Sequence, residues 1–483
     1  MAGTMATGQI AAVSLLALAF GAVPAASAGP AVPSAATRQL IARNAEFSQA
    51  IIKVAPNVYV ADGYGVSPLT MVIGTDGYFL VDTGVDVAQS RLVRAEFEKL
   101  TGLPLKAIIF THGHNDHVTG APAFLTPGQA IDIWAARNFG SEDRWQEAAG
   151  LRIQNLRGLR QSGMALPDAK RINNGVAKAF RPERRPGQAR PADAILPNKF
   201  VDTQIETIIA GVKVVMVRSQ GETDDTITVW LPDQRVVFAG DNFYKSWPNA
   251  PAIRGTGYRD VLAWAQSIDA MKVLKPAVLV GGHTKPIVGA AEVDSVVGNY
   301  ARGIRYIFDE TIKGMNEGKS AEELAATIRL PADLAALDYP KPYYGNPEWT
   351  IKSIFTAYLG WFDGNPTNLF RLPPKAEAQR LIALAGGEAR VRREMSRALQ
   401  GGDWQWATEL LDRLLALNPQ DQQLRNLKAD ALEALAEQLL TATGRNYYLS
   451  YAQELRSNPA AGPAPPPAPP PVPPPVPLLL PQA

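Results

Sequence analysis

The chain has 483 residues and a nearly balanced charge, with 48 Lys and Arg against 46 Asp and Glu. This length predicts two or three domains with a large buried core, and the charge balance gives no electrostatic case for nucleic-acid binding, which would need a basic face. The chain has no cysteine, which excludes disulfides, thiolate metal sites and cysteine nucleophiles. Any metal site must therefore be built from His, Asp or Glu.

The two ends of the chain are predicted to lie outside the folded domains. An apolar run at residues 10–23 precedes small residues ending in A-S-A at 26–28, which is typical of a cleaved signal peptide over residues 1–28. We therefore expect a periplasmic or secreted protein. The alternative is a disordered alanine-rich leader, because no Lys or Arg precedes Arg38. The run is too short for a stable membrane span, and residues 457–483 are so rich in proline that we expect a disordered tail.

Residues 29–300 are predicted to form a catalytic domain of the α/β class. Short runs of Val, Ile, Phe and Tyr between Asp-Gly turns predict strands. The helix that follows them has Val93, Phe97 and Leu100 on one face. Strands and helices then alternate, which predicts mixed sheets covered by helices. A polar, Arg-rich insertion at about 131–198 is expected to hold a helix and a long loop beside the site.

Four predicted strands end next to a polar residue, and these residues are His112, Glu222, Asp241 and His283. Ligands of open α/β sheets bind beyond the carboxyl ends of the strands. We therefore expect side chains from distant parts of the chain to meet at one sheet edge.

The second half of the chain has a helical pattern. Ser320 and Glu323 form a capping-box pattern at the start of one helix. Residues 375–455 are almost wholly helical in pattern, and 398–439 resemble a single tetratricopeptide helix pair. One such pair cannot bury its own apolar face. We therefore predict an all-α helical dimerisation domain over 301–456, packed on neighbouring helices or on a second chain.

The segment THGHNDHVTG, residues 111–120, gathers three of the four histidines of the chain. Alternate residues of an extended segment point the same way, so His112 and His114 can bind one ion. Asp116 and His117 then face a second position. Imidazoles and carboxylates suit Zn²⁺, and an open coordination position would make the site catalytic.

Two further residues complete a candidate two-metal set. The fourth histidine, His283, follows a predicted strand, and Asp241 is a candidate bridging carboxylate. With D-T-G at 82–84 and the first motif, their order and spacing make residues 58–289 resemble the metallo-β-lactamase superfamily. The resemblance implies an αββα sandwich with one or two metals at the sheet edge.

One departure from the superfamily pattern narrows this resemblance. Most members have a histidine where this chain has Glu222, within SQGETDDT. The alkyl sulfatases of the superfamily use a glutamate there, and residues 358–374 and the helix pair resemble their dimerisation domain. The resemblance thus extends from about 58 to 456. Asp224 or Asp225 is the alternative to Glu222 as ligand.

The resemblance implies a centre of two Zn²⁺ per chain. The implied ligands of the first metal are His112, His114 and Glu222. Those of the second metal are Asp116, His117 and His283, and Asp241 is the implied bridge between the two. Asp116 and Asp241 are the expected catalytic residues, acting with a metal-activated water. Family members hold sulfate with residues that match Arg254 and Asn249. For Arg254, a surface salt bridge is the alternative.

The expected function is a secreted binuclear zinc hydrolase that cleaves alkyl sulfate esters as a homodimer. One alternative is another hydrolase of the superfamily, acting on a lactam, lactone, thioester or phosphoester. The other is a non-catalytic metal-binding dimer. Glu222 and the sulfatase-like helical region favour the first reading, and the complete ligand set argues against the last.

Overall fold

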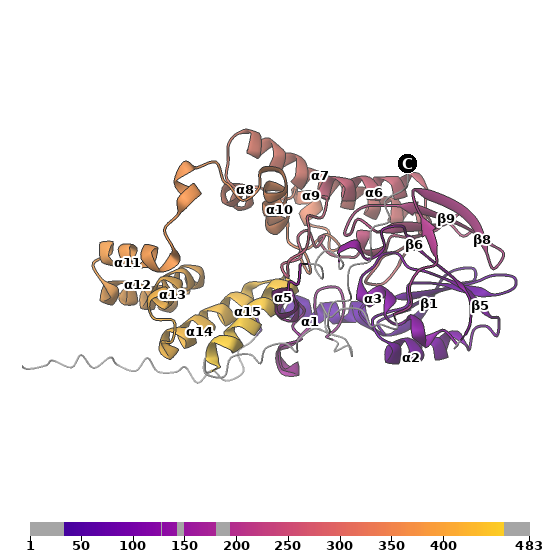
Figure 1. Ribbon diagram of the computed structural model, residues 1–483, viewed down its shortest axis with the longest axis horizontal. Coiled ribbons are helices and arrows are strands. Elements are labelled where there is room, and N and C mark those ends of the chain that lie inside the picture. The colour runs from indigo at the N-terminus through magenta and orange to yellow at the C-terminus, as the bar shows by residue number, and fades with distance from the viewer. Residues whose placement is uncertain (1–32, 127, 143–148, 180–193, 458–483) are drawn as a thin grey trace, which may run out of the picture. The chain divides into compact units, whose positions relative to one another are not determined.

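The structure is a computed structural model of the chain (Figure 1), which describes residues 33–126, 128–142, 149–179 and 194–457. The predicted signal peptide lies outside the described residues, as does the predicted tail apart from Ser457. Within the described ranges, no helix combines the length and the apolar character needed to cross a membrane. The predicted α/β architecture followed by a helical region is confirmed.

Two β-sheets form the centre of the catalytic region. The first contains seven strands in chain order: β1 (Ala50–Ala55), β2 (Val58–Asp62), β3 (Leu69–Ile73), β4 (Tyr78–Val81), β5 (Leu105–Ile109), β6 (Asp132–Ala136) and β7 (Lys199–Val201). Strands β1 to β4 pair antiparallel, whereas β4 to β7 pair parallel. The second contains six strands, in spatial order β13 (Ile287–Val288), β12 (Val278–Val280), β11 (Val236–Phe238), β10 (Ile227–Leu231), β9 (Val212–Arg218) and β8 (Gln204–Ile209). Only β11 and β12 pair parallel in it.

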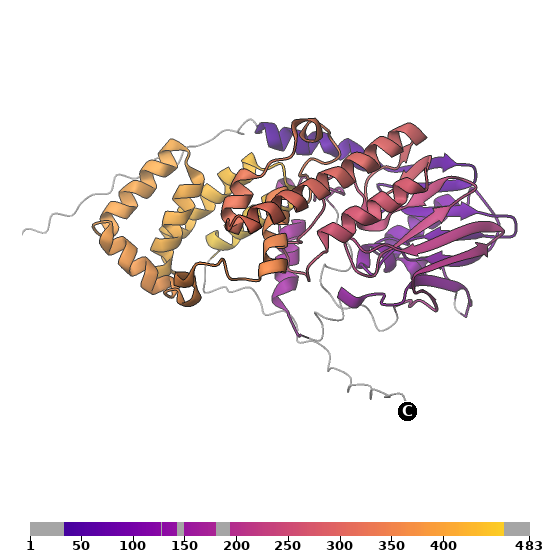
Figure 2. The ribbon, with the colours of Figure 1, turned by 90° about the horizontal axis from the view of Figure 1, so that it is seen from above.

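The sheets pack face to face and helices cover their outer faces. Phe79 of the first sheet and Met216 of the second belong to one apolar core between them. Helix α2 (Val87–Phe97) packs on the other face of the first sheet. Helices α6 (Val261–Val273) and α7 (Ala290–Asn316) pack on the other face of the second, where Figure 2 shows them side by side. This is the αββα order that the resemblance implied.

The expected apolar face of the first long helix is partly wrong. Val93 and Phe97 are buried as predicted, but α2 ends at Phe97 and Leu100 is 40% exposed. Asp86 begins this helix, since its side chain accepts a hydrogen bond from the backbone N–H of Gln89 at 2.8 Å. Leu100 thus lies in the turn after the helix, where helical periodicity no longer sets its direction.

Short helices join the strands. They are α1 (Ala35–Arg43), η1 (Asn44–Phe47), α3 (Asn115–Val118), η2 (Ala121–Ala123), α5 (Ile153–Ser162), η3 (Asp168–Lys170) and η4 (Gly240–Asn242). Helix α5 is the helix expected in the Arg-rich insertion. It packs against the last helix of the chain, and Arg160 Nε donates to Glu454 Oε1 at 2.8 Å.

The C-terminal half is helical, as predicted. After α7 come α8 (Ala321–Thr327), α9 (Ala332–Ala335), α10 (Pro347–Leu359), η5 (Pro366–Phe370), α11 (Pro374–Leu384), α12 (Glu388–Gly401), α13 (Trp404–Leu417), α14 (Gln422–Gln438) and α15 (Ala442–Arg456). The capping box is confirmed, because Ser320 and Glu323 bond each other's backbone N–H at the start of α8. Helices α13 and α14 form the expected pair. The predicted boundary at residue 300 lies inside α7.

Candidate metal centre

The ends of four strands bring the predicted ligands together. His112 and His114 follow β5 and lead into α3, which carries Asp116 and His117. The other three ligands follow β9, β11 and β12, with Asp241 on η4. Their ligand atoms form two groups, each within 4.8 Å: His112, His114, Glu222 and Asp241; and Asp116, His117 and His283. The described structure therefore places all seven at one sheet edge, with the division into two positions that the sequence suggested.

The histidines beside the second position are each held by one ring nitrogen. His117 Nδ1 lies 2.7 Å from Asp82 Oδ2, and His283 Nδ1 donates to the Val66 carbonyl at 2.9 Å. The other nitrogen, Nε2, faces the cluster in both residues. A metal-binding histidine typically donates its second N–H to a carboxylate or a carbonyl in this way, which orients the ring.

The histidines beside the first position are also held by one ring nitrogen, but His114 is held by Nε2 instead of Nδ1. His112 Nδ1 lies 3.1 Å from Thr111 Oγ1, so its Nε2 points inward. His114 Nε2 lies 3.3 Å from Glu142 Oε2, so its Nδ1 points inward. The inward His112 Nε2 and His114 Nδ1 are 3.0 Å apart. All four histidines thus present one nitrogen to a common centre.

Two carboxylates of the cluster, Glu222 and Asp241, are buried and incompletely bonded. Over the described part of the chain, Glu222 Oε2, Asp241 Oδ1 and His117 Nε2 have no hydrogen-bond partner. Asp241 Oδ1 lies 3.1 Å from His117 Nε2 without hydrogen-bond geometry, and Asp241 Oδ2 lies 3.2 Å from His283 Nε2. Buried polar atoms without partners are costly. A cation at the centre would satisfy these atoms together, so the donor set fits a divalent metal pair.

The pKa shifts report the same crowding. Burial raises the pKa of Glu222 well above its ordinary range, and the neighbouring Asp241 adds to this although Arg259 opposes it. Burial alone would also raise the pKa of Asp241, but the charges of His283 and His117 outweigh it and hold that pKa low. Two carboxylates in contact therefore differ in proton affinity, which is the usual result when like charges share a site.

The competing ligand candidates have other roles. Asp225 is buried, but it accepts hydrogen bonds from Gly140 N at 2.7 Å and from Thr223 Oγ1 at 2.6 Å. Asp224 accepts a hydrogen bond from Ser141 at the surface. Neither belongs to the groups of converging ligand atoms, so the geometry favours Glu222.

The two predicted sulfate-binding residues lie beside the first position. Arg254 Nη2 lies 3.4 Å from Glu142 Oε1, the same carboxylate that contacts His114. Arg254 therefore does form an ion pair, with Glu142, as the alternative expected. That ion pair lies next to His114 rather than on a remote surface. Asn249 is buried, and its backbone N–H donates to Tyr244 Oη at 2.8 Å.

Sequence reasoning missed four residues of the site. Asp82 lies in the D-T-G motif, but that motif carried no assigned role. Arg259 donates hydrogen bonds to Glu222 and, at 3.0 Å, to the Asn249 carbonyl. Burial would lower the pKa of Arg259, yet the charges of Glu222 and Glu142 raise it.

The remaining two are Glu142 and Tyr244. The Tyr244 ring lies 5.8 Å from the His283 ring and 5.6 Å from the Tyr344 ring. No motif marked either residue. Arg259 lies five positions after Arg254, and neither a motif nor the family resemblance marked it.

Two family profiles match the chain. The metallo-beta-lactamase superfamily matches residues 63–283, which include every predicted ligand. The alkyl sulfatase dimerisation family matches residues 320–458, which run from the N-cap of α8 past α15. The order of the two domains confirms the resemblance drawn from the motifs.

The chain is similar over most of its length to several alkylsulfatases. A linear primary-alkylsulfatase from a Pseudomonas strain is 34% identical over 392 residues, covering 80% of this chain and 73% of the relative. The alkyl/aryl-sulfatase BDS1 of Saccharomyces cerevisiae is 28% identical over 88% of this chain and 67% of its own length. The solved structure of the stereoselective inverting sec-alkylsulfatase Pisa1 from Pseudomonas sp. superposes with a TM-score of 0.78 at 26% identity, covering 87% of this chain and 67% of that one. The chain belongs to the alkylsulfatases of the metallo-β-lactamase superfamily.

Proposed function

We propose that this protein hydrolyses alkyl sulfate esters with a pair of bound Zn²⁺ ions. The observation that carries the proposal is the cluster of four histidines and three carboxylates, in which every histidine has one ring nitrogen held and the other turned inward. Membership of the alkylsulfatase family supports sulfate esters as the substrate class. The ligands are nitrogen and carboxylate oxygen, which suit zinc.

The ligands form two groups, each of which would bind one ion. His112, His114 and Glu222 would hold the first, and the second would be held by Asp116, His117 and His283, with Asp241 between them. When bound, such a pair supplies Lewis acidity, which lowers the pKa of water and provides a nucleophile near neutral pH.

Within this centre the two catalytic aspartates differ in exposure. The Asp116 side chain is 24% exposed, whereas Asp241 is buried. Asp116 is therefore the carboxylate placed to orient the attacking water and accept its proton, while Asp241 holds the two halves of the cluster together. Arg254 and Asn249 would bind the sulfate oxygens, because a guanidinium offers paired donors to such an anion.

We further propose that the protein is exported and dimeric. The apolar run and A-S-A triplet of residues 10–28 support export to the periplasm or beyond, and a cysteine-free chain tolerates an oxidising compartment. The match to an alkyl sulfatase dimerisation domain supports a homodimer.

Metal analysis and a substrate panel test the function. We expect about two Zn²⁺ per chain in protein purified without chelator, and release of sulfate from a primary or secondary alkyl sulfate. His114→Ala should abolish turnover, and Arg254→Ala should raise KM. Protein without metal, or turnover of only a β-lactam, lactone, thioester or phosphodiester in the same panel, would overturn the proposal.

A further inference from the structure

We propose that Arg259 is a second sulfate-binding arginine, acting with Asn249, and that Glu142 is a positioning residue that connects this subsite to His114. The inference rests on the proposed sulfatase function and extends it, since neither the motifs nor the family resemblance assigned a role to Arg259 or Glu142.

The first observation is the unused side of a buried guanidinium. Arg259 is only 3% exposed. Its Nη1 donates to Glu222 and to the Asn249 carbonyl. Its Nε and Nη2 are buried and have no hydrogen-bond partner in the described parts of the chain. These two nitrogens form one edge of the guanidinium, the fork that matches two oxygens of an oxyanion.

The second observation is a further unused donor next to this arginine. Asn249 Nδ2 is buried and, among the residues described, also lacks a partner. The two residues are adjacent, because Arg259 Nη1 lies 3.0 Å from the Asn249 carbonyl oxygen. Buried donors in native proteins are normally satisfied by protein, water or ligand. Unsatisfied donors on two neighbouring residues, beside a metal ligand, are best satisfied together by a ligand with several acceptor oxygens.

The third observation is the carboxylate that joins the parts. Glu142 Oε2 lies 3.3 Å from His114 Nε2 and 3.7 Å from Arg259 Nη2, and Glu142 Oε1 lies 3.4 Å from Arg254 Nη2. These contacts hold both arginines near the metal position. They are long for charge-assisted hydrogen bonds, so they leave the donors available to an anion. Glu142 also orients the His114 ring.

Charge supports an anion at this place. Arg254 and Arg259 bring two positive charges to the subsite. Glu142 contacts Arg254 and His114, and Glu222 contacts Arg259. When metal binds Glu222, part of its negative charge is shared with the metal, so Arg259 attracts a sulfate more strongly. The competing role for Arg259 is purely structural: a counter-charge that holds Glu222 in place.

Three variants and one control separate these roles in the full-length, metal-loaded protein. Arg259→Lys keeps the charge but loses the fork, Arg259→Gln removes the charge, and Glu142→Gln weakens the link to His114. Arg445→Gln is the matched control, because Arg445 is also a buried arginine with a carboxylate partner, Glu437 at 2.8 Å. Four quantities are measured for each: zinc content, calorimetric Kd for decyl sulfonate, and kcat and KM for decyl sulfate. The sulfonate has the same terminal oxygens but no ester bond to cleave.

We expect Arg259→Lys to weaken sulfonate binding at least tenfold and to raise KM similarly, at unchanged zinc content and with a smaller effect on kcat. Glu142→Gln should lower zinc affinity and raise KM severalfold, and the control should match the wild type. If Arg259→Lys and Arg259→Gln bind the sulfonate as tightly as the wild type, the inference is wrong and Arg259 is only a counter-charge.

The same titration separates this inference from the proposed function. If the wild type cleaves decyl sulfate and the Arg259 variants have the same sulfonate Kd and the same KM, the subsite is wrong but the proposed function stands. A wild type that cleaves no sulfate ester but binds the sulfonate through Arg259 overturns the function and keeps the anion subsite. A wild type that neither cleaves nor binds overturns both.

Discussion

Single residues outside the ligand set decide how the ligands are presented. Asp82 has a backbone φ of 58°, which is uncommon for a residue other than glycine. This conformation turns its carboxylate into the site, where it accepts the Thr111 N–H at 2.8 Å and contacts His117 Nδ1 at 2.7 Å. One side chain therefore fixes both the start of the histidine turn and the tautomer of a ligand.

Asp82→Asn is expected to weaken zinc binding by about 10- to 100-fold, because loss of a partner that orients a ligand typically has this effect. The measurement is competition with a chelator of known affinity. Asp86→Asn is the matched control, since Asp86 is a buried aspartate on the same turn that caps α2 instead. Zinc affinity that falls equally in both variants would contradict the role assigned to Asp82.

A different aspartate gives the protein a pH-dependent stability. Burial raises the pKa of Asp62 from 3.8 to about 7, and the charge of Glu46 contributes. The folded protein therefore binds this proton more tightly than the unfolded chain does. Its contribution to stability is present at low pH and is lost as pH rises from about 4 through about 7. The full shift corresponds to about 4 kcal/mol, an upper figure because local opening hydrates the carboxylate.

Asp62→Asn removes that titration. We expect the stability of the variant relative to the wild type to rise by about 1–3 kcal/mol between pH 5 and pH 8, because the wild type loses most of the Asp62 contribution over that range. Denaturant unfolding of both proteins at each pH measures the difference. A difference that is independent of pH would show that Asp62 is not the titrating group.

At the scale of elements, the strand ends explain how much of the site the sequence could predict. The strands before His112, Asp241 and His283 are short apolar runs bounded by turn residues, and such local patterns are visible without any structure. All seven ligands follow such runs or lie in the histidine motif.

The site residues that the sequence did not predict, such as Glu142 and Arg259, can be recognised only from their tertiary contacts. Glu142 follows the turn after β6, and its role depends on three partners that are 28, 112 and 117 positions away in the chain, namely His114, Arg254 and Arg259. The family resemblance marked Arg254 but not Arg259, whose deep burial is visible only in the structure. The Leu100 error has a local cause, because the residue that ends a helix is weakly specified by periodicity.

A close approach between two of these strand-end loops makes a glycine necessary. A Cβ on Gly282 would lie 1.9 Å from Asp241 Oδ1 and 2.8 Å from Asp241 N. Gly282→Ala must therefore displace the Asp241 carboxylate, and we expect zinc content to fall and stability to drop by about 1–3 kcal/mol. Gly257→Ala is the control, since a Cβ there has no atom within 4 Å. Normal zinc content in Gly282→Ala would contradict this account of the loop contact.

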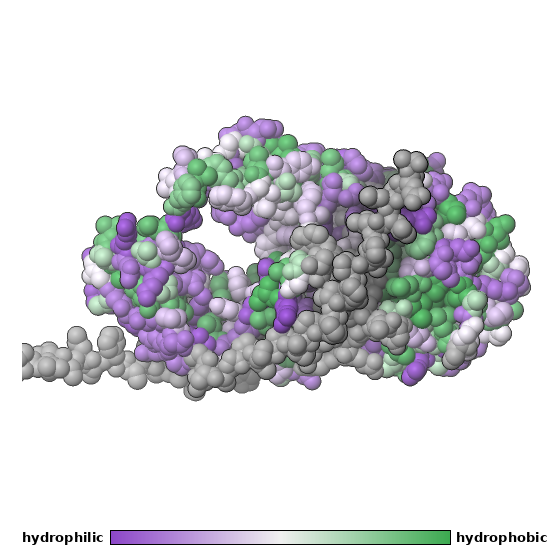
Figure 3. Space-filling model, in the orientation of Figure 1, coloured by the Kyte–Doolittle hydropathy of each residue, from purple (hydrophilic) through white to green (hydrophobic). Residues whose placement is uncertain are grey.

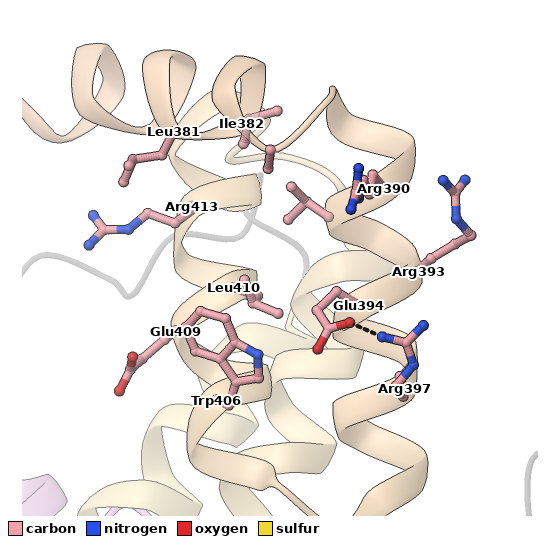
Figure 4. A pocket seen from close by; sticks show the side chains of 12 residues that line it. Leu381, Ile382, Arg390, Arg393, Glu394, Arg397, Trp406, Glu409, Leu410 and Arg413 are labelled. Carbon is pink, nitrogen blue, oxygen red and sulfur yellow. Dashed lines mark hydrogen bonds and ion pairs between the residues drawn. The ribbon is translucent and has the colours of Figure 1, made fainter.

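At the scale of the whole molecule, the helical region leaves apolar surface uncovered. The connection between α10 and α11 includes Trp361, 74% exposed, and Phe370, 95% exposed. Figure 1 shows it as an extended connection between these two helices, and Figure 3 shows hydrophobic residues on its surface. A cavity of about 630 Å³ lies between α11, α12 and α13, with Leu381, Leu410 and Trp406 around it (Figure 4). Large exposed aromatic side chains in a dimerisation domain mark a contact surface.

Phe370→Asp tests whether a second copy of the chain covers that surface. A charge placed in a buried apolar contact must be desolvated without a partner, so we expect the dimer Kd to rise about 100-fold or more, equivalent to about 3 kcal/mol. Sedimentation velocity over a range of concentrations measures it. The matched control is Ile208→Asp, which changes a 73% exposed residue of β8 in the catalytic region and should leave the dimer intact. A wild type that stays monomeric at every concentration removes the dimer altogether. A dimer unchanged by Phe370→Asp instead moves the contact away from η5, because no buried interface tolerates an unpaired carboxylate at its centre.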